Sequence, residues 1–499
     1  MPKMPGVKRS AVRRPVARVC RSALLLALVG VGVAAAAPPE TVLADAAKRA
    51  DWAAVRTLLQ AGADVDARQG DGSTALHWAS YRDNREIAAL LIRAGADVDA
   101  ANDLGVTALW TACENGSSAM VEALLEAGAD PNTPLPFGET PLMTAARAGN
   151  ADVVGRLLAA GAEVDAATEP GAYGAQTALM WAVAQKHPAV VEVLLAHGAD
   201  VHARSTTFTE TVKTVSTYAN YGLQCVPRDE CYITEVQSGG FTPLLFAARV
   251  GDLASARLLA AAGADVNGTT PDGASALAVA ALSGNGAVGA LLLEHGADPN
   301  AAGGGYAPLH AAILQRDPDL AQALLAAGAD PNARVSASTR YTRDSADFFF
   351  PPWYVGAPAL WLAARHREAG IMRLLARHGA DPHATHDPQY WTRDRGTAAG
   401  RMWVEEGETT ALMAAVGLGG RDPLWAVEHR ARVGEATELG GGPDRTAAEA
   451  AALEAVRVAV ALGVDVDAAN ARGRTAVSAA RVNGFDEVAA FLVEHGAKR

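Results

Sequence analysis

The chain has 499 residues, of which 50% are hydrophobic and 20% are charged, so it can bury a core and is not a disordered polymer. Its formal charge of −12 argues against a nucleic-acid partner, because phosphate backbones are bound mainly by Lys and Arg. The length alone would suggest several domains, but a fixed internal period overrides that expectation.

Residues 1–36 have the composition of a secretory leader. Seven basic and no acidic residues accompany an apolar run at 23–33, and three alanines follow at 34–36. Export and cleavage require these features in this order, so we expect a mature chain of residues 37–499 that is periplasmic or secreted. Cleavage would take the formal charge from −12 to −19. The alternative is an uncleaved membrane anchor, although the apolar run is shorter than the ~20 residues of a spanning helix.

A short glycine motif then recurs along the chain. It reads Ala-Gly-Ala-Asp-Val-Asp at 61–66 and 94–99 and Ala-Gly-Ala-Asp-Pro-Asn at 127–132, a step of 33 residues. Each glycine follows an apolar segment that predicts a helix, and a left-handed glycine ends a helix at little steric cost. The motif predicts eleven units, whose glycines are Gly62, Gly95, Gly128, Gly161, Gly198, Gly263, Gly296, Gly328, Gly379, Gly463 and Gly496.

A second element follows each glycine motif, for example Glu-Thr-Pro-Leu-Met-Thr-Ala at 139–145 and Phe-Thr-Pro-Leu-Leu-Phe-Ala at 241–247. Thr can cap the free amides of a helix, and Pro is tolerated at its first position. The period and the two motifs together resemble the ankyrin-repeat family from about Thr41 to Ala497. The resemblance implies an all-α solenoid of paired helices joined by β-hairpin fingers, with one concave face.

The family's contact positions fall just after the first helix of each unit. Carried over to this chain, they predict an exposed, mixed-charge surface for a protein partner, made by Tyr81, Arg82, Glu114, Asn115, Arg147, Arg249, Arg365 and His366. The resemblance also implies a structural hydrogen bond, and no catalysis, for His77 and His310.

Four long inserts interrupt the period, at 204–240, 334–356, 384–408 and 417–445. All but the last lie between a glycine turn and the next Thr-Pro-Leu element, which places them on the fingers, along one edge. The last separates the two helices of one repeat. Inserts gathered on one face usually mark a binding face, and loops of this length are uncommon unless they are functional or disordered.

These inserts hold fourteen of the chain's 27 aromatic residues, and the densest cluster lies at 348–354. Aromatic side chains dominate binding hot spots. We therefore predict partner contacts from Phe348, Phe349, Phe350, Trp353 and Tyr354. The alternative is that these rings fold back and cover the edge of the solenoid itself.

Two cysteines, Cys225 and Cys231, share the first long insert. An exported protein meets oxidising conditions, so we predict a disulfide between them. A two-cysteine metal site and a redox pair remain as alternatives, the first lacking nearby ligands and the second having a tighter usual spacing. Cys113 falls in a repeat helix and is expected in the core.

Little in the sequence suggests catalysis or a cofactor. His383 and His386 could bind a metal together with Asp381 and Asp387, but this pattern is weak and we expect no metal. The chain contains no phosphate-binding loop, nucleophile elbow or His-Glu-x-x-His helix. The prediction is a monomeric, exported, non-catalytic module that binds a protein through its fingers and concave face, without nucleic acid or, after cleavage, membrane. The alternative is a stabilising or protective companion of an exported enzyme such as an oxidoreductase.

Overall fold

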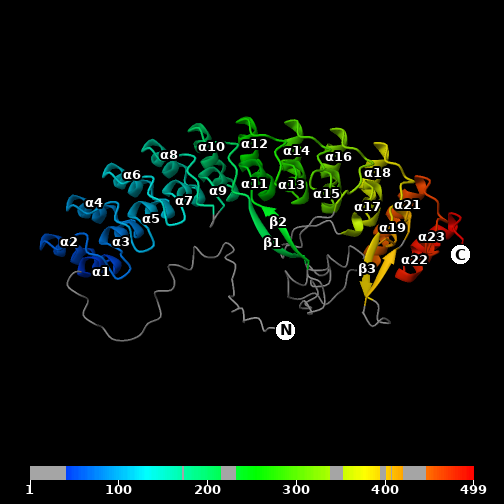
Figure 1. The fold of residues 1–499 in the computed structure, drawn as a ribbon, viewed down its shortest axis with the longest axis horizontal. Helices are drawn as coiled ribbons and strands as arrows, with labels where there is room; N and C mark the ends of the chain where they lie inside the picture. The colour runs from blue at the N-terminus through cyan, green and yellow to red at the C-terminus, as the bar shows by residue number, and fades with distance from the viewer. Residues whose placement is uncertain are drawn as a thin grey trace, which may run out of the picture.

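The computed structural model describes residues 41–170, 174–214, 232–337, 352–393, 401–405, 407–419 and 445–498. Within these ranges the chain forms 22 α-helices, which stack as eleven pairs into one curved array (Figure 1). The predicted all-α solenoid and its number of repeats are confirmed. The leader, residues 1–36, lies outside the described residues.

The two helices of each pair form two rows. The first helices lie along the inner, concave side of the array and the second helices along its outer side (Figure 1). The inner row consists of α1 (Val42–Lys48), α3 (Ala75–Tyr81), α5 (Ala108–Asn115), α7 (Pro141–Ala148), α9 (Ala178–Ala184), α11 (Pro243–Val250), α13 (Ala276–Leu282), α15 (Pro308–Gln315), α17 (Ala359–Arg365), α19 (Ala411–Ala415) and α22 (Ala476–Asn483). The outer row consists of α2 (Trp52–Gln60), α4 (Arg85–Arg93), α6 (Ser118–Glu126), α8 (Ala151–Ala159), α10 (Pro188–Ala196), α12 (Leu253–Ala261), α14 (Gly286–Glu294), α16 (Pro318–Ala326), α18 (Ala369–Arg377), α21 (Arg445–Ala461) and α23 (Asp486–Glu494).

The repeated Thr begins most of the first helices as expected. In α5 the Thr107 hydroxyl accepts a bond of 3.2 Å from the Trp110 amide, and in α7 Thr140 caps a helix whose first residue is Pro141. The second helices begin in the same way on short polar residues such as Asp51. These caps satisfy amides that have no partner inside the helix.

A left-handed residue links the two helices of each described pair from α1 to α18. Glycine fills this position in four of these repeats, for example Gly116 with φ 67°. The other five use Ala50, Asp83, Lys186, Arg316 and Arg367, all with φ between 50° and 61°. A side chain is strained in this conformation, so the array tolerates a local cost in these five repeats.

One continuous hydrophobic core runs from Leu43 to Ala497. Its members come from every helix pair, and alanine fills many of the positions where first helices pack on one another. No single pair can enclose its own apolar face, so each repeat is stabilised by its neighbours.

Polar bonds between neighbouring fingers fix the repeats in register. The side chains of Asp66 and Asp99 each accept a bond of 2.9 Å from the equivalent amide of the following repeat. Asn332 continues this series across an insert, since its side chain accepts from the Asp381 amide at 2.8 Å. The insert at 334–356 therefore leaves the stacking of the repeats intact.

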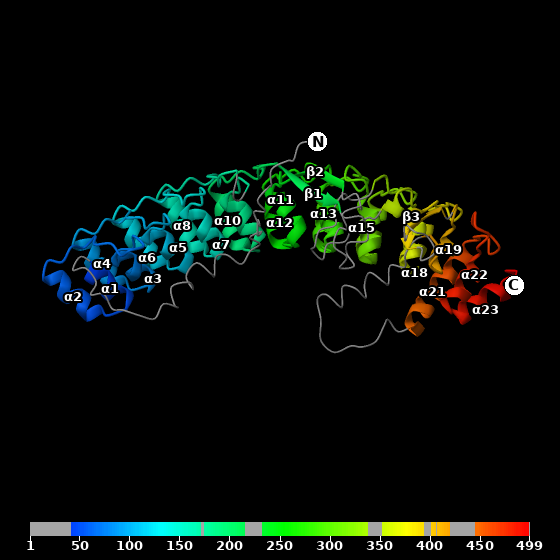
Figure 2. The same cartoon turned by 60° about the horizontal axis from the view of Figure 1, so that its bottom comes forward.

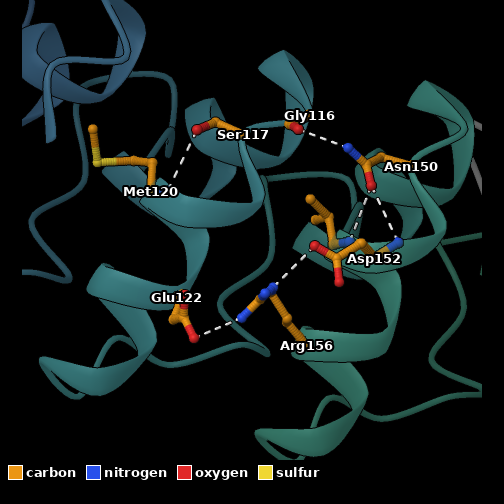
Figure 3. Close-up of polar contacts among 8 residues, drawn as sticks. Gly116, Ser117, Met120, Glu122, Asn150, Asp152 and Arg156 are labelled. Atoms are coloured by element: carbon orange, nitrogen blue, oxygen red, sulfur yellow. Dashed lines mark hydrogen bonds and ion pairs between the residues drawn. The ribbon is translucent and has the colours of Figure 1, made fainter.

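The outer row is tied together in a similar way between α6 and α8 (Figure 3). Arg156 contacts Asp152 on its own helix at 3.1 Å and Glu122 on the neighbouring helix at 2.8 Å. Asn150 accepts from the Asp152 amide and donates to the Gly116 carbonyl of the preceding repeat. Asn150, which caps α8, thus also bonds the left-handed Gly116 that links α5 to α6 in the preceding repeat.

Two of the inserts contain antiparallel β-hairpins, a feature the sequence did not predict for them. In the first, β1 (Phe208–Thr214) pairs with β2 (Tyr232–Ser238); in the second, β3 (Gln389–Arg393) pairs with β4 (Arg401–Glu405). Both hairpins project on the concave side of the array in Figure 1, and Figure 2 shows β1–β2 at the edge along which the repeat-joining loops run.

The bases of these inserts coincide with the fingers, as predicted. Ser205 and Phe241 are joined by a backbone hydrogen bond of 3.0 Å, and single β-bridges close the later inserts at Arg334–Pro358 and His386–Thr409. The insert at 417–445 lies outside the described residues except at its ends, so its predicted emergence at the opposite edge stays a prediction.

Candidate functional site

The concave face of the first six repeats carries a strip of aromatic and cationic side chains. We call it the concave strip; it consists of Lys48, Trp78, Tyr81, Arg82, Arg147, Trp181, Phe241, Phe246 and Arg249, all exposed or half-buried. Most of these residues come from the first helices, whose remaining faces pack against neighbouring helices. Side chains that the first helices leave exposed therefore face the concavity.

Two cation–aromatic contacts in this strip cross from one repeat to the next. The Lys48 ammonium lies 5.0 Å from the Trp78 ring centre, and the Arg147 guanidinium lies 5.7 Å from the Trp181 ring centre. In both pairs the cation is the seventh residue after a helix cap and the ring is the fourth residue after the next cap. Such contacts contribute about 0.5–1 kcal/mol when exposed, and they hold the charged groups in place.

The strip also contains contacts within a repeat. Arg82 lies 5.5 Å from the Tyr81 ring, whose edge meets Trp78 at 5.9 Å between centres. In the sixth repeat Arg249 lies 5.8 Å from the Phe241 ring. Rigid aromatic rings beside arginines are the side chains most often found at binding hot spots.

Six of the eight predicted contact residues lie on this open face, but four of them also serve internal contacts. The Arg82 guanidinium donates to the Lys48 carbonyl of the preceding repeat at 3.4 Å. Arg147 pairs with Glu114 at 2.6 Å and with the buried Glu139 at 3.5 Å. The Asn115 side chain donates to the carbonyls of Ser80, at 3.3 Å, and Tyr81, at 3.1 Å, in the preceding repeat. Exposure at these positions therefore coexists with a role in holding adjacent repeats together.

The expectation of exposure is wrong for the two remaining contact residues, Arg365 and His366. Their exposed fractions are 1% and 7%. The ring of Tyr354 packs across His366, with 5.9 Å between ring centres, because the end of the insert at 334–356 folds over α17. Neither residue presents a surface to a partner in this arrangement.

Two aromatic residues of the cluster at 348–354 are described by the structure, and both pack against the solenoid. Tyr354 is 4% exposed, with its hydroxyl 3.3 Å from His366 Nε2 and its ring against Trp361 at 6.2 Å between centres. Trp353 is half-buried and packs against the core. Tyr354 is therefore part of the core, as the alternative interpretation expected. The other predicted ring contacts, Phe348, Phe349 and Phe350, lie outside the described residues.

His386 connects three segments that are distant in the sequence. Its ring lies 4.5 Å from the Trp361 ring between centres, its Nε2 bonds the Trp353 carbonyl at 2.8 Å, and its backbone pairs with Thr409. Burial lowers the pKa of His386, because it disfavours the charged form of the ring. Its neighbours are those of a packing residue.

Structural roles for His77 and His310 are confirmed. In each, Nδ1 accepts a backbone amide at its own helix start and Nε2 bonds a carbonyl of the next finger, at 2.8 Å for His77 and 2.9 Å for His310. Burial lowers the pKa of both rings, to about 4 for His310. Cys113 is also buried as expected, and burial raises the pKa of its thiol.

Several other predictions concern parts of the chain that are not described. The predicted disulfide partners Cys225 and Cys231 lie outside the described residues.

Among the described residues, no cluster of three or more His, Cys, Asp or Glu side chains could hold a metal ion. No helix in the described ranges combines the length and hydrophobicity needed to span a membrane.

The sequence did not identify the aromatic members of the strip. Trp78, Trp181 and Phe246 occupy the fourth position after the cap, which looks like an ordinary core position in a single repeat. Aligning the repeats would have shown large rings in this column beside cations in the seventh column. These residues can be recognised only by comparing the same position in several repeats, because no single repeat distinguishes them from core residues.

Comparison with known proteins supports the repeat assignment. The family described as "Ankyrin repeats (3 copies)" matches residues 43–135, 132–205, 224–303 and 244–335, which together span more than half of the chain. No curated protein matches the sequence.

Proposed function

Because the chain belongs to the ankyrin-repeat family, whose repeats generally serve in protein–protein interaction, we propose that it binds a protein partner in the concavity of its first six repeats. The concave strip is the observation that carries this proposal. It offers exposed arginines next to half-buried rings on a scaffold held in register by polar bonds between repeats. Pre-ordered side chains lose little conformational entropy on binding.

The proposed contact surface is smaller than the one expected from the sequence. It keeps Tyr81, Arg82, Glu114, Asn115, Arg147 and Arg249 and excludes the buried Arg365, His366 and Tyr354. The fingers and the β1–β2 hairpin border this surface on the concave side (Figure 1). The protein acts without catalysis and as a monomer in this proposal.

We also propose export followed by cleavage before Ala37. The basic start, the apolar run and the three alanines of residues 1–36 support this location. Sequencing the amino terminus of protein from a cell-envelope fraction tests it. Intact Met1 on cytoplasmic protein would refute export.

Binding is tested with two double variants of the mature chain. Arg82→Ala with Arg249→Ala changes the concave strip, whereas Arg93→Ala with Arg257→Ala removes two exposed arginines from second helices of the same repeats. Both variants and the wild type are immobilised and used to capture proteins from the envelope fraction, which are identified by mass spectrometry. We expect the concave variant alone to lose the partner, while its melting temperature falls by no more than the few degrees that the loss of two exposed cation–aromatic contacts causes.

Equal capture by both double variants would refute binding through the concave strip. Capture lost together with a melting temperature lowered well beyond that of the control variant and beyond these few degrees would also contradict it, because the strip would then be structural.

A further inference from the structure

We propose that the concave strip binds an acidic segment of its partner, in which carboxylates alternate with apolar side chains. This inference rests on the proposed function and adds the chemistry of the partner. Three observations support it. The strip is cationic, the carboxylates near it are bound to partners within the array, and two finger tips of neighbouring repeats expose apolar side chains.

The sign of charge at the strip differs from that of the chain. The whole chain carries −12, yet in the first six repeats the residues that end the first helices and lead into the next turn include six cations and only two carboxylates. The cations are Lys48, Arg49, Arg82, Arg147, Lys186 and Arg249, and the carboxylates are Asp83 and Glu114. Such an inversion on an acidic protein favours an acidic partner segment through complementary potentials.

Helix dipoles do not account for this pattern. A cation near the end of a helix is stabilised by the dipole in any repeat. At the position that Arg147 and Arg249 occupy in their repeats, however, the seventh and eighth repeats have Leu282 and Leu314. At this position, an exposed or half-buried cation therefore occurs in the described chain only within the first six repeats, although Arg316 of the eighth repeat lies two residues further on.

The carboxylates near the strip already have internal partners. Glu114 and Glu139 both face Arg147, at 2.6 and 3.5 Å. Asp45 accepts from the Thr41 hydroxyl at 3.1 Å, and Asp83 accepts from the Ser117 hydroxyl. These contacts hold the negative groups within the array, so a ligand in the concavity meets mainly cations and rings.

Apolar side chains at two adjacent finger tips extend this surface. Leu104 is 63% exposed and Phe137 is 56% exposed, on the fingers that follow the second and third repeats. The two tips are neighbours, since a Cβ added at Gly105 would lie 3.0 Å from Pro136 Cδ. Exposed apolar residues beside a cationic strip suit an acidic segment with leucine or aromatic anchors better than a polyphosphate chain.

The test selects short random peptides on the immobilised mature wild-type chain, with no assumption about the natural partner. We expect the selected peptides to be enriched in Asp and Glu and to carry leucine or aromatic residues. Each is then measured by fluorescence anisotropy against two charge reversals of equal net charge, R82E/R249E on the strip and R93E/R257E on second helices. We expect affinity to fall by about ten-fold or more in the first only, and to weaken with added salt.

Selected peptides that are neutral or basic, or that bind both reversals equally, would overturn the acidic-segment proposal. So would single-stranded DNA that binds the wild-type chain and displaces the peptides. The proposed function fails on a different result, namely partner capture that is insensitive to Arg82→Ala with Arg249→Ala. If that capture is lost while the selected peptides are not acidic, only the partner chemistry is wrong.

Discussion

Replacing Tyr354 with Ala tests whether the aromatic insert stabilises the array or binds a partner. The ring is 4% exposed and meets Trp353, Trp361 and His366 with 6.4, 6.2 and 5.9 Å between ring centres. Loss of a buried aromatic ring costs about 3–5 kcal/mol of unfolding free energy. Tyr354→Phe keeps the ring and removes only the hydroxyl, 3.3 Å from His366 Nε2, and should cost about 1 kcal/mol.

The position of this loss in the array can be measured as well as its size. Repeats pass stability mainly to their neighbours, so faster hydrogen exchange is expected in α15, α17 and α19 and little change in α3 and α5. Mass spectrometry of the exchanged peptides reports each helix separately. Binding to the concave strip should be unchanged under conditions in which the variant is folded.

The opposite outcome would refute this account of the insert. Wild-type exchange in α17 and α19 combined with lost partner binding in Tyr354→Ala would make Tyr354 an interface residue. The original sequence-based expectation would then be correct, and the packing of Tyr354 on Trp361 would contribute little to stability.

Three further predictions concern single sites. Lys186→Gly should raise the unfolding free energy, measured by urea titration, by about 0.5–1 kcal/mol, because Lys186 has a left-handed backbone with φ 61° that glycine adopts without strain. The control Glu192→Gly, inside helix α10, should lower the unfolding free energy by a similar amount. Stability should fall between pH 6.5 and 4 by about 3 kcal/mol from His310 alone, since its pKa is depressed to about 4 in the fold and the unfolded chain takes up the proton first; His310→Met should flatten that part of the urea-derived pH profile. Peptide mapping of exported protein without reductant should recover Cys225 and Cys231 in one disulfide-linked peptide, and two free thiols would refute this.

Much of the fold could be predicted from the sequence because each helix pair is specified by residues that are close together in the chain. A cap such as Thr140, the Pro141 that follows it and the glycine turn at the end of the pair specify one helix pair without reference to distant residues. The period then gives the number of pairs. The hairpins β1–β2 and β3–β4 were not predicted, because strand pairing joins segments through an insert of unique sequence.

The contact surface predicted from the sequence differs from the one in the structure because some of its residues are buried. Arg249 and Arg365 occupy the same position in their repeats, so the sequence predicts one role for both, yet Arg249 is exposed and Arg365 is 1% exposed. The difference arises because Tyr354 and its insert fold over α17, whereas the β1–β2 insert leaves Arg249 uncovered.

The sequence by itself determined the eleven repeats, their caps and turns, and the row of positions where contacts were expected. The tertiary structure alone decided which of those positions are open. The reason is that a helix start depends on residues within one turn of the chain, whereas the exposure of a side chain depends on whatever packs against it. At Arg365 and His366 the covering residues come from an insert that follows no repeat pattern.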